Sequence, residues 1–166
     1  MQELYEKKLV TYPRTDARVL STAVAKEIYK NISGLKRYTP MAAYADEVLN
    51  MGSYKTIAKT KYVNDKQITD HYAIIPTGQG MGALRGLSEI AANVYEIICR
   101  RFLSIFYPAA EYQKLAMTLA KQDEFLFANF KYMLKEGYLK VATNRFARKK
   151  DDTKYSPEFI ETIGHL

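Results

Sequence analysis

The chain has 166 residues, a length typical of one domain or of one domain with part of another. Apolar residues make up 48% and charged residues 26%, a balance that excludes wholesale disorder, and no apolar run approaches the ~18 residues that span a membrane. Lysine and arginine (25) outnumber aspartate and glutamate (18), and the net charge of +7 favours polyanionic partners: nucleic acid, phosphorylated ligands or an anionic membrane surface.

Cysteine and histidine are too few for a disulfide or a structural zinc site. Cys99 is the one cysteine, so it cannot form an internal disulfide, and we expect it to be a small buried residue. His71 and His165 are the two histidines. Residues 1–8 mix acids with bases and no apolar run follows them, so we expect no signal peptide and a reducing, cytoplasmic location.

Three amphipathic helices are predicted, separated by extended segments. The first follows a cap at Ser21 or Thr22 and is closed by Gly34, and the second runs from Thr39-Pro40 to Gly52. The third and longest is capped by Ser88 and ends before Pro108. Its predicted apolar stripe consists of Ile90, Val94, Ile98, Phe102 and Ile105.

The remaining segments favour extended structure. Residues 54–63 predict a strand with lysines alternating outward, and residues 69–78 predict a short apolar strand stopped by proline and glycine. Four glycines within residues 78–86 predict a flexible connector. Beyond Pro108 the apolar period changes to two. Residues 108–142 therefore predict a β-meander, whose last strand, residues 138–142, follows a turn at Gly137.

Tyr12, Arg14 and Asp16 form the first candidate site. Pro13 forces Tyr12 toward an extended backbone, in which residues two apart point the same way. A guanidinium binds a phosphate bidentately and can stabilise a developing phenolate, so Arg14 suits a nucleophilic Tyr12. Asp16 could orient Arg14. An ordinary strand end is the structural alternative.

His71 marks the second candidate site, at the edge of the apolar segment that follows it. An imidazole there could donate to a phosphate oxygen or shuttle a proton, although a histidine satisfied by its surroundings is the commoner case. From the residues alone, the sequence indicates a basic, phosphate-binding protein and no more.

The two motifs together resemble the active-site region of type IA DNA topoisomerases. They are Tyr-Glu-Lys-Lys-Leu-Val-Thr-Tyr-Pro-Arg-Thr-Asp at 5–16 and Asp-His-Tyr-Ala-Ile-Ile-Pro-Thr at 70–77. Ile75 favours the bacterial topoisomerase III branch. Residues 94–102 are similar to the family's helix after the second motif, and residues 125–141 to its returning β segment. Ala17 stands where the family usually has serine.

The resemblance implies a mechanism. Tyr12 would attack a single-stranded DNA phosphodiester, Arg14 would clamp the phosphate, and His71 would contact it nearby. Asp16, Thr77 and Lys8 would support the site or bind DNA. Strand passage through the break would relax negative supercoils or decatenate DNA without a nucleotide energy source.

The resemblance also implies an α+β fold in two parts and partners outside the chain. Residues 1–107 would be most of a largely helical, winged-helix-like catalytic-tyrosine domain, 108–142 an antiparallel β segment of the arch domain, and 143–166 a charged tail. Mg²⁺ would be bound by an acidic domain of the full-length enzyme, one of the remaining domains with which this fragment would associate. We expect no metal in these residues and no relaxation by the chain alone. We also expect no membrane partner, and self-association through an unpaired β edge.

Two other classes stay open. One is a non-catalytic single-stranded DNA-binding module in which Tyr12 stacks a base. The other is a relaxase or recombinase that uses tyrosine chemistry on another fold, although the relaxases need a histidine metal cluster that two histidines do not supply.

Overall fold

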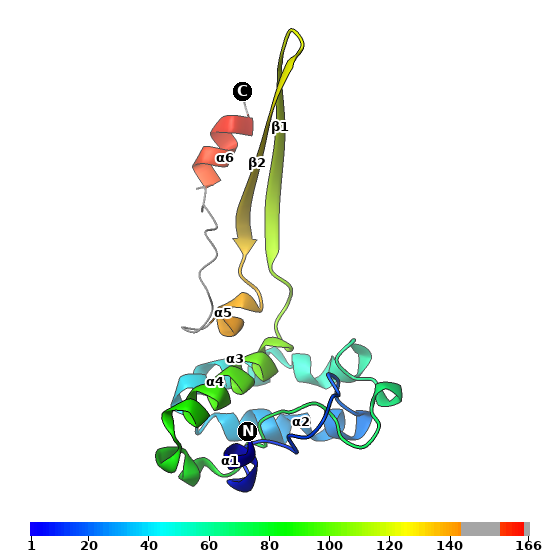
Figure 1. The fold of residues 1–166 in the computed structure, drawn as a ribbon, viewed down its shortest axis with the longest axis vertical. Helices are drawn as coiled ribbons and strands as arrows, with labels where there is room; N and C mark the ends of the chain where they lie inside the picture. The colour runs from blue at the N-terminus through cyan, green and yellow to red at the C-terminus, as the bar shows by residue number, and fades with distance from the viewer. Residues whose placement is uncertain (144–156, 165–166) are drawn as a thin grey trace.

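The computed structural model describes residues 1–143 and 157–164, and it has a helical body from which a long β-hairpin projects (Figure 1). The predicted mixed helix-and-strand class is confirmed. Of the predicted charged tail, residues 144–156 and 165–166 lie outside the described residues. Within the described part of the chain, every helix is too short or too polar to cross a membrane.

The body contains four α-helices and three 3₁₀ helices, and two further helices follow the hairpin in the part of the chain that the structure describes. In chain order the elements are α1 (Gln2–Glu6), α2 (Thr22–Leu35), α3 (Thr39–Met51), η1 (Ser53–Lys59), η2 (Asp65–Gln67), η3 (Met81–Gly86), α4 (Glu89–Ser104), β1 (Glu111–Lys121), β2 (Glu124–Lys135), α5 (Leu139–Ala142) and α6 (Pro157–Gly164).

The predicted starts of α2 and α4 are confirmed by their capping bonds, whereas Thr39 is the first residue of α3 and not its cap, since Tyr38 occupies the N-cap position without a side-chain hydrogen bond. Ser21 Oγ accepts a hydrogen bond from Val24 N at the start of α2, and Ser88 Oγ accepts one from Ala91 N at the start of α4. Gly52 ends α3 in the left-handed conformation, with φ of 69°. These local signals therefore set the boundaries of the body's main helices.

Gly34 does not close α2 as predicted. The helix continues to Leu35, and Gly34 is buried inside it against Gly78, where a Cβ on Gly34 would overlap the Gly78 carbonyl. Gly78 itself has φ of 75°, and a Cβ there would lie 2.8 Å from the Asn31 carbonyl oxygen. The two glycines let the segment after the second motif pack directly on the backbone of α2.

The strand predicted over residues 54–63 is wrong, because Ser53–Lys59 form the 3₁₀ helix η1. Lys55 and Lys59 are exposed, while Ile57 between them is buried. The glycine-rich connector likewise contains a helical turn, η3.

The buried face of α4 is offset from the predicted stripe. Ile90 is 78% exposed, and the buried side is formed by Ala91, Tyr95, Cys99, Phe102 and Leu103. Cys99 is fully buried, as predicted. The buried side begins one residue later in the same first turn, at Ala91, and Phe102 belongs to both the predicted stripe and the buried side.

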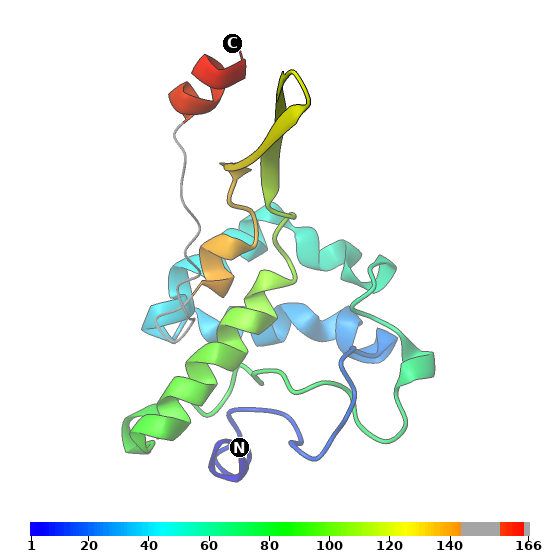
Figure 2. The ribbon, with the colours of Figure 1, turned by 45° about the horizontal axis from the view of Figure 1, so that its top comes forward.

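The meander is a two-stranded antiparallel hairpin in the described residues, with Leu115 opposite Phe130. The third strand predicted at residues 138–142 is wrong. Gly137 (φ 52°) turns the chain, Tyr138 N donates to Pro108 O (2.8 Å), and α5 follows. Figure 2 shows α5 beside α4 at the base of the hairpin, where Val141 is buried.

Candidate active site

The segment that carries Tyr12 runs antiparallel to the segment that carries His71. Three backbone hydrogen bonds join them: Thr11 N to Ile75 O (3.0 Å), Thr77 N to Leu9 O (3.0 Å) and Ala73 N to Val19 O (2.9 Å). The predicted strand over residues 69–78 is reduced to an isolated bridge between Val10 and Pro76. Proline has no N–H, and Ile75 N is taken by the Thr11 hydroxyl (3.0 Å), so a regular ladder does not form.

Threonine hydroxyls reinforce this pairing on both sides of Tyr12. Thr77 Oγ1 donates to Lys8 O (2.6 Å), which holds Lys8 in a positive-φ conformation (60°). Thr15 Oγ1 donates to His71 O (3.0 Å) and accepts from Ala17 N (3.1 Å). Thr77 therefore fastens the two motifs together here, and Thr15, which the sequence analysis passed over, does the same at the other end.

The rings of Tyr12 and His71 lie against each other. Their centroids are 4.3 Å apart with an interplanar angle of 37°, and Tyr5 meets Tyr12 edge-on at 5.4 Å. Tyr12 is half-buried and His71 is exposed. The Tyr12 hydroxyl has no hydrogen-bond partner among the described residues.

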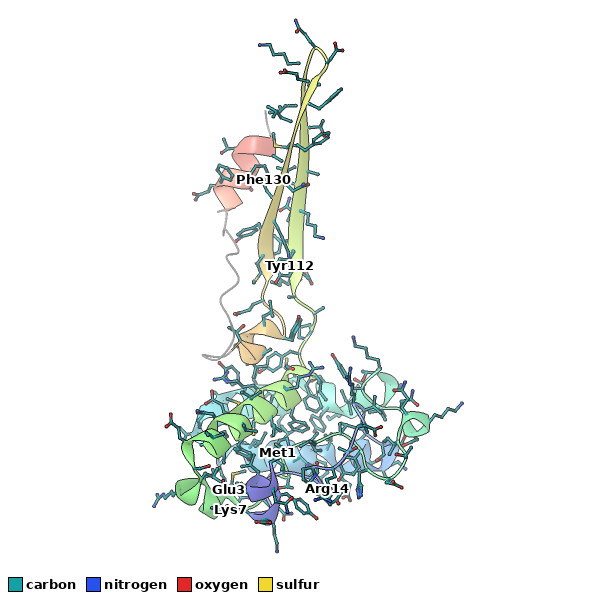
Figure 3. The ribbon with its side chains drawn as sticks, in the orientation of Figure 1. Met1, Glu3, Lys7, Arg14, Tyr112 and Phe130 are labelled. Carbon is teal, nitrogen blue, oxygen red and sulfur yellow. The ribbon has the colours of Figure 1, made fainter. Side chains whose placement is uncertain are left out.

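Arg14 and Asp16 follow Tyr12 on the exposed surface of the body. Arg14, labelled in Figure 3, lies in the helical body, whereas Tyr112 and Phe130 mark the hairpin. No ion pair joins Arg14 to Asp16 among the described residues, so the arrangement in which Asp16 orients Arg14 is not formed here. Lys8 is also exposed.

Helix α1 is fixed on α4 by residues that the sequence analysis did not single out. The Glu3 carboxylate accepts from Ser88 N (3.3 Å) and Ser88 Oγ (3.0 Å). The backbone bond contributes most to holding the pKa of Glu3 below its ordinary value. Lys7 Nζ donates to Gly86 O (2.9 Å). These contacts position Tyr5 against Tyr12, and their signal in the sequence is only the helix cap at Ser88.

Metal-binding side chains do not form a cluster of three within the described residues. Across residues 1–143 and 157–164, no three His, Cys, Asp or Glu side chains gather closely enough to hold a metal ion. Asp70 and His71 are neighbours without a third such group. What the site does offer is a phenol ring against an imidazole ring, with the exposed Arg14 two residues after Tyr12 in the chain. A phenol and an imidazole are groups suited to phosphate chemistry.

Comparison with known proteins shows which family the chain resembles. The profile of the family described as "DNA topoisomerase" matches residues 1–162. DNA topoisomerase 3 of Bacillus licheniformis is 35% identical over 165 residues, which are 99% of this chain and 22% of that protein. DNA topoisomerase 3 of Bacillus subtilis is 35% identical over 144 residues, 85% of this chain and 19% of that protein. The chain thus spans about a fifth of the length of these relatives. With a family match along nearly its whole length, the chain belongs to the DNA topoisomerase family.

Proposed function

We propose that this chain carries the strand-cleaving tyrosine of a type IA DNA topoisomerase, with Tyr12 as the nucleophile toward single-stranded DNA. The observation that carries the proposal is the contact of the Tyr12 and His71 rings, 4.3 Å between centroids, in a member of the DNA topoisomerase family. The backbone pairing of the two motifs supports it, because it holds both side chains on rigid segments.

The proposed reaction is a transesterification. The Tyr12 phenol oxygen attacks the phosphorus and the phosphorus–O3′ bond breaks. The phenol proton goes to the departing 3′ oxygen, leaving a free 3′ hydroxyl and a 5′-phosphotyrosine. Arg14 binds the scissile phosphate and offsets its developing charge, and His71 donates to a phosphate oxygen or relays the proton. The reverse attack by the 3′ hydroxyl reseals the strand after another has passed.

The expected division of the chain is part of this proposal. Residues 1–107 would form the tyrosine-bearing domain, with winged-helix-like character, and residues 108–142 would belong to the arch. We propose that Mg²⁺ is bound by an acidic domain of the longer protein. No step of the reaction is assigned to a metal bound by the described residues. We therefore expect the isolated chain to leave a negatively supercoiled plasmid unrelaxed in magnesium, and relaxation would contradict this expectation.

A chimera tests the catalytic role of Tyr12. This chain would replace the matching segment of Bacillus licheniformis DNA topoisomerase 3, and covalent adducts with a labelled single strand would be counted after denaturation. We expect adducts at Tyr12 that disappear in Tyr12→Phe. Tyr5→Phe is the matched control, because it removes a neighbouring phenol oxygen and should keep the adduct.

Two results would overturn the proposal. Adducts that persist in Tyr12→Phe would assign the chemistry to another residue. A folded chimera without adducts, whose single-strand binding needs the Tyr12 ring but not its hydroxyl, would favour the binding-module alternative, in which Tyr12 only stacks a base.

Self-association through the hairpin is a separate proposal about partners. The tip of the hairpin exposes large apolar side chains: Leu119 (58%), Phe125 (57%), Leu126 (70%) and Phe127 (74%). Both strands of this two-stranded sheet have an edge without a further strand among the described residues. Static light scattering at rising concentration tests this. A monomer throughout the range would count against it.

A further inference from the structure

A cavity of about 460 Å³ lies where the helical body meets the hairpin. Its wall includes Lys61 and Tyr62 from the loop after η1, Arg101 and Tyr107 from the end of α4 and the residues that follow, and Tyr138 from the base of the hairpin. These residues lie outside the Tyr12 and His71 motifs. We propose that this cavity binds one unpaired nucleotide, with its base against the tyrosine rings and its phosphate on Lys61 and Arg101.

Two positive charges flank one ring in this cavity. Lys61 Nζ lies 5.5 Å from the centroid of the Tyr62 ring, and Arg101 Cζ lies 6.0 Å from the same centroid. Neither Lys61 nor Arg101 has a carboxylate partner within the part of the chain that the structure describes. An entering phosphate therefore meets two uncompensated cations, and the guanidinium can bind it bidentately.

The carboxylate that contacts Tyr107 of the cavity wall is already engaged by a lysine. Tyr107 Oη donates to Glu47 Oε2 (2.9 Å), and Lys140 Nζ lies 2.9 Å from the same oxygen. The Glu47 charge is thus balanced by Lys140 and does not cancel those of Lys61 and Arg101. Burial and the hydrogen bond to Glu47 raise the pKa of Tyr107, which keeps this phenol neutral and its ring fixed at the cavity.

The composition of the wall selects the class of ligand. The volume lies within the range of about 300–1,000 Å³ that accommodates small organic ligands. Aromatic rings interleaved with cations are typical of sites for unpaired bases, since a ring stacks on a base face and a cation contacts the backbone. Inorganic phosphate would use the cations alone, and a duplex keeps its base faces stacked inside. An unpaired nucleotide uses both features.

The cavity is connected to the proposed active site through the backbone. Leu20 N donates to Tyr62 O (2.8 Å), and Leu20 lies eight residues after Tyr12 in the same irregular segment. Eight residues span at most about 29 Å. A strand held at Tyr12 could therefore place a further nucleotide in this cavity. The identification of that strand as DNA rests on the proposed function, whereas the preference for a nucleotide rests on the cavity's own residues.

Equilibrium binding to the 166-residue chain tests the charges. The probe is a fluorescein-labelled five-residue oligothymidylate, followed by anisotropy over a series of salt concentrations. Arg101→Gln and Lys61→Gln should each lower the slope of log affinity against log salt by about 0.7. Lys26→Gln, an exposed lysine of α2, is the charge-matched control and should leave the slope unchanged. Equal slopes in all three variants would overturn the proposal.

Substitution of the ring tests the base contact. Tyr62→Leu should weaken binding at least about fivefold, whereas Tyr62→Phe should keep the affinity because the ring stays. Tyr138→Leu, at a side chain that is 38% exposed, supplies a second variant if Tyr62→Leu unfolds by circular dichroism. Affinity that is unaffected in the folded leucine variant, or lost equally in Tyr62→Phe, would contradict stacking.

Photocrosslinking locates the base directly. An oligonucleotide with one 5-iododeoxyuridine should crosslink to Tyr62, Tyr107 or Tyr138, as identified by mass spectrometry, and thymidine monophosphate should compete better than inorganic phosphate. If free thymidine monophosphate reduces the crosslink as strongly as the unlabelled oligonucleotide does, the free nucleotide is itself a ligand of the same site. Crosslinks confined to residues 5–16 or to the hairpin, or equal competition by phosphate, would overturn the proposal. The absence of a Tyr12 adduct in the chimera would refute the proposed function alone.

Discussion

Gly78→Ala tests whether the close contact between α2 and the second motif holds the candidate site together. The new Cβ would lie 2.8 Å from Asn31 O and 3.1 Å from Lys30 O, both backbone atoms, so the segment must shift by several tenths of an ångström. Overpacking of this kind costs about 1–3 kcal/mol. The φ of 75° adds about 1–2 kcal/mol for an L-residue.

Alanine also lowers the conformational entropy of the unfolded chain, which returns about 0.4–1 kcal/mol. The free energy of unfolding should therefore fall by about 3 kcal/mol in Gly78→Ala, equivalent to about 6–12 °C in Tm for a chain of this size. Urea unfolding followed by circular dichroism measures the free energy of unfolding, and calorimetry measures Tm.

Two glycines provide matched controls. Gly52 has φ of 69° but its nearest neighbour would be 3.9 Å from a Cβ, so Gly52→Ala isolates the backbone cost, about 1 kcal/mol net. Gly82 has open space around it, and Gly82→Ala should be neutral or slightly stabilising. If Gly78→Ala lost no more stability than Gly52→Ala, the contact with Asn31 would not be important and the reasoning would be refuted.

Other predictions concern hydrogen bonds and ionisation in the body. The hydrogen bond from Lys140 lowers the pKa of Glu47, so the ionised carboxylate stabilises the fold above about pH 4.5, and this stabilisation is lost as the pH falls. In urea titrations between pH 5 and pH 3, the free energy of unfolding of Glu47→Gln should therefore fall less than that of the wild type. Burial raises the pKa of Cys99 to about 12, and the thiol should react with a disulfide reagent at pH 8 only after unfolding. Ser88→Ala removes the α4 cap and should cost about 1 kcal/mol in urea unfolding, and an unchanged midpoint would contradict it. Thr77→Val removes the hydroxyl that holds Lys8 O and should cost about 1–2 kcal/mol and increase amide exchange across the paired motifs.

Local signals in the sequence predicted the parts of the fold that depend on neighbouring residues. Ser21 and Ser88 cap their helices because a cap needs only a hydroxyl and the amides three residues on. The alternation beyond Pro108 likewise predicted the hairpin.

Contacts between distant segments could not be predicted in the same way. Gly34 has the features of a helix stop, but its burial depends on Gly78, 44 positions later. Residues 54–63 contain β-favouring side chains, yet the turn that Gly52 imposes and the burial of Ile57 produce a 3₁₀ helix. Of the site, the motifs identified Tyr12 and His71, whereas the pairing that brings their rings together depends on the Thr11 and Thr77 hydroxyls.

The hairpin is long compared with the few backbone contacts that hold its base. Strand β1 has 11 residues, so at about 3.4 Å per residue the arm is about 37 Å long. Its base is held where Tyr138 N bonds to Pro108 O and Gly137 packs on the Ala109 backbone. A swing of about 10° at this base moves the apolar tip through an arc of about 6 Å, calculated from the same rise per residue. Small changes in a few backbone angles beside the Lys61–Arg101 cavity thus become large displacements at Phe125 and Leu126.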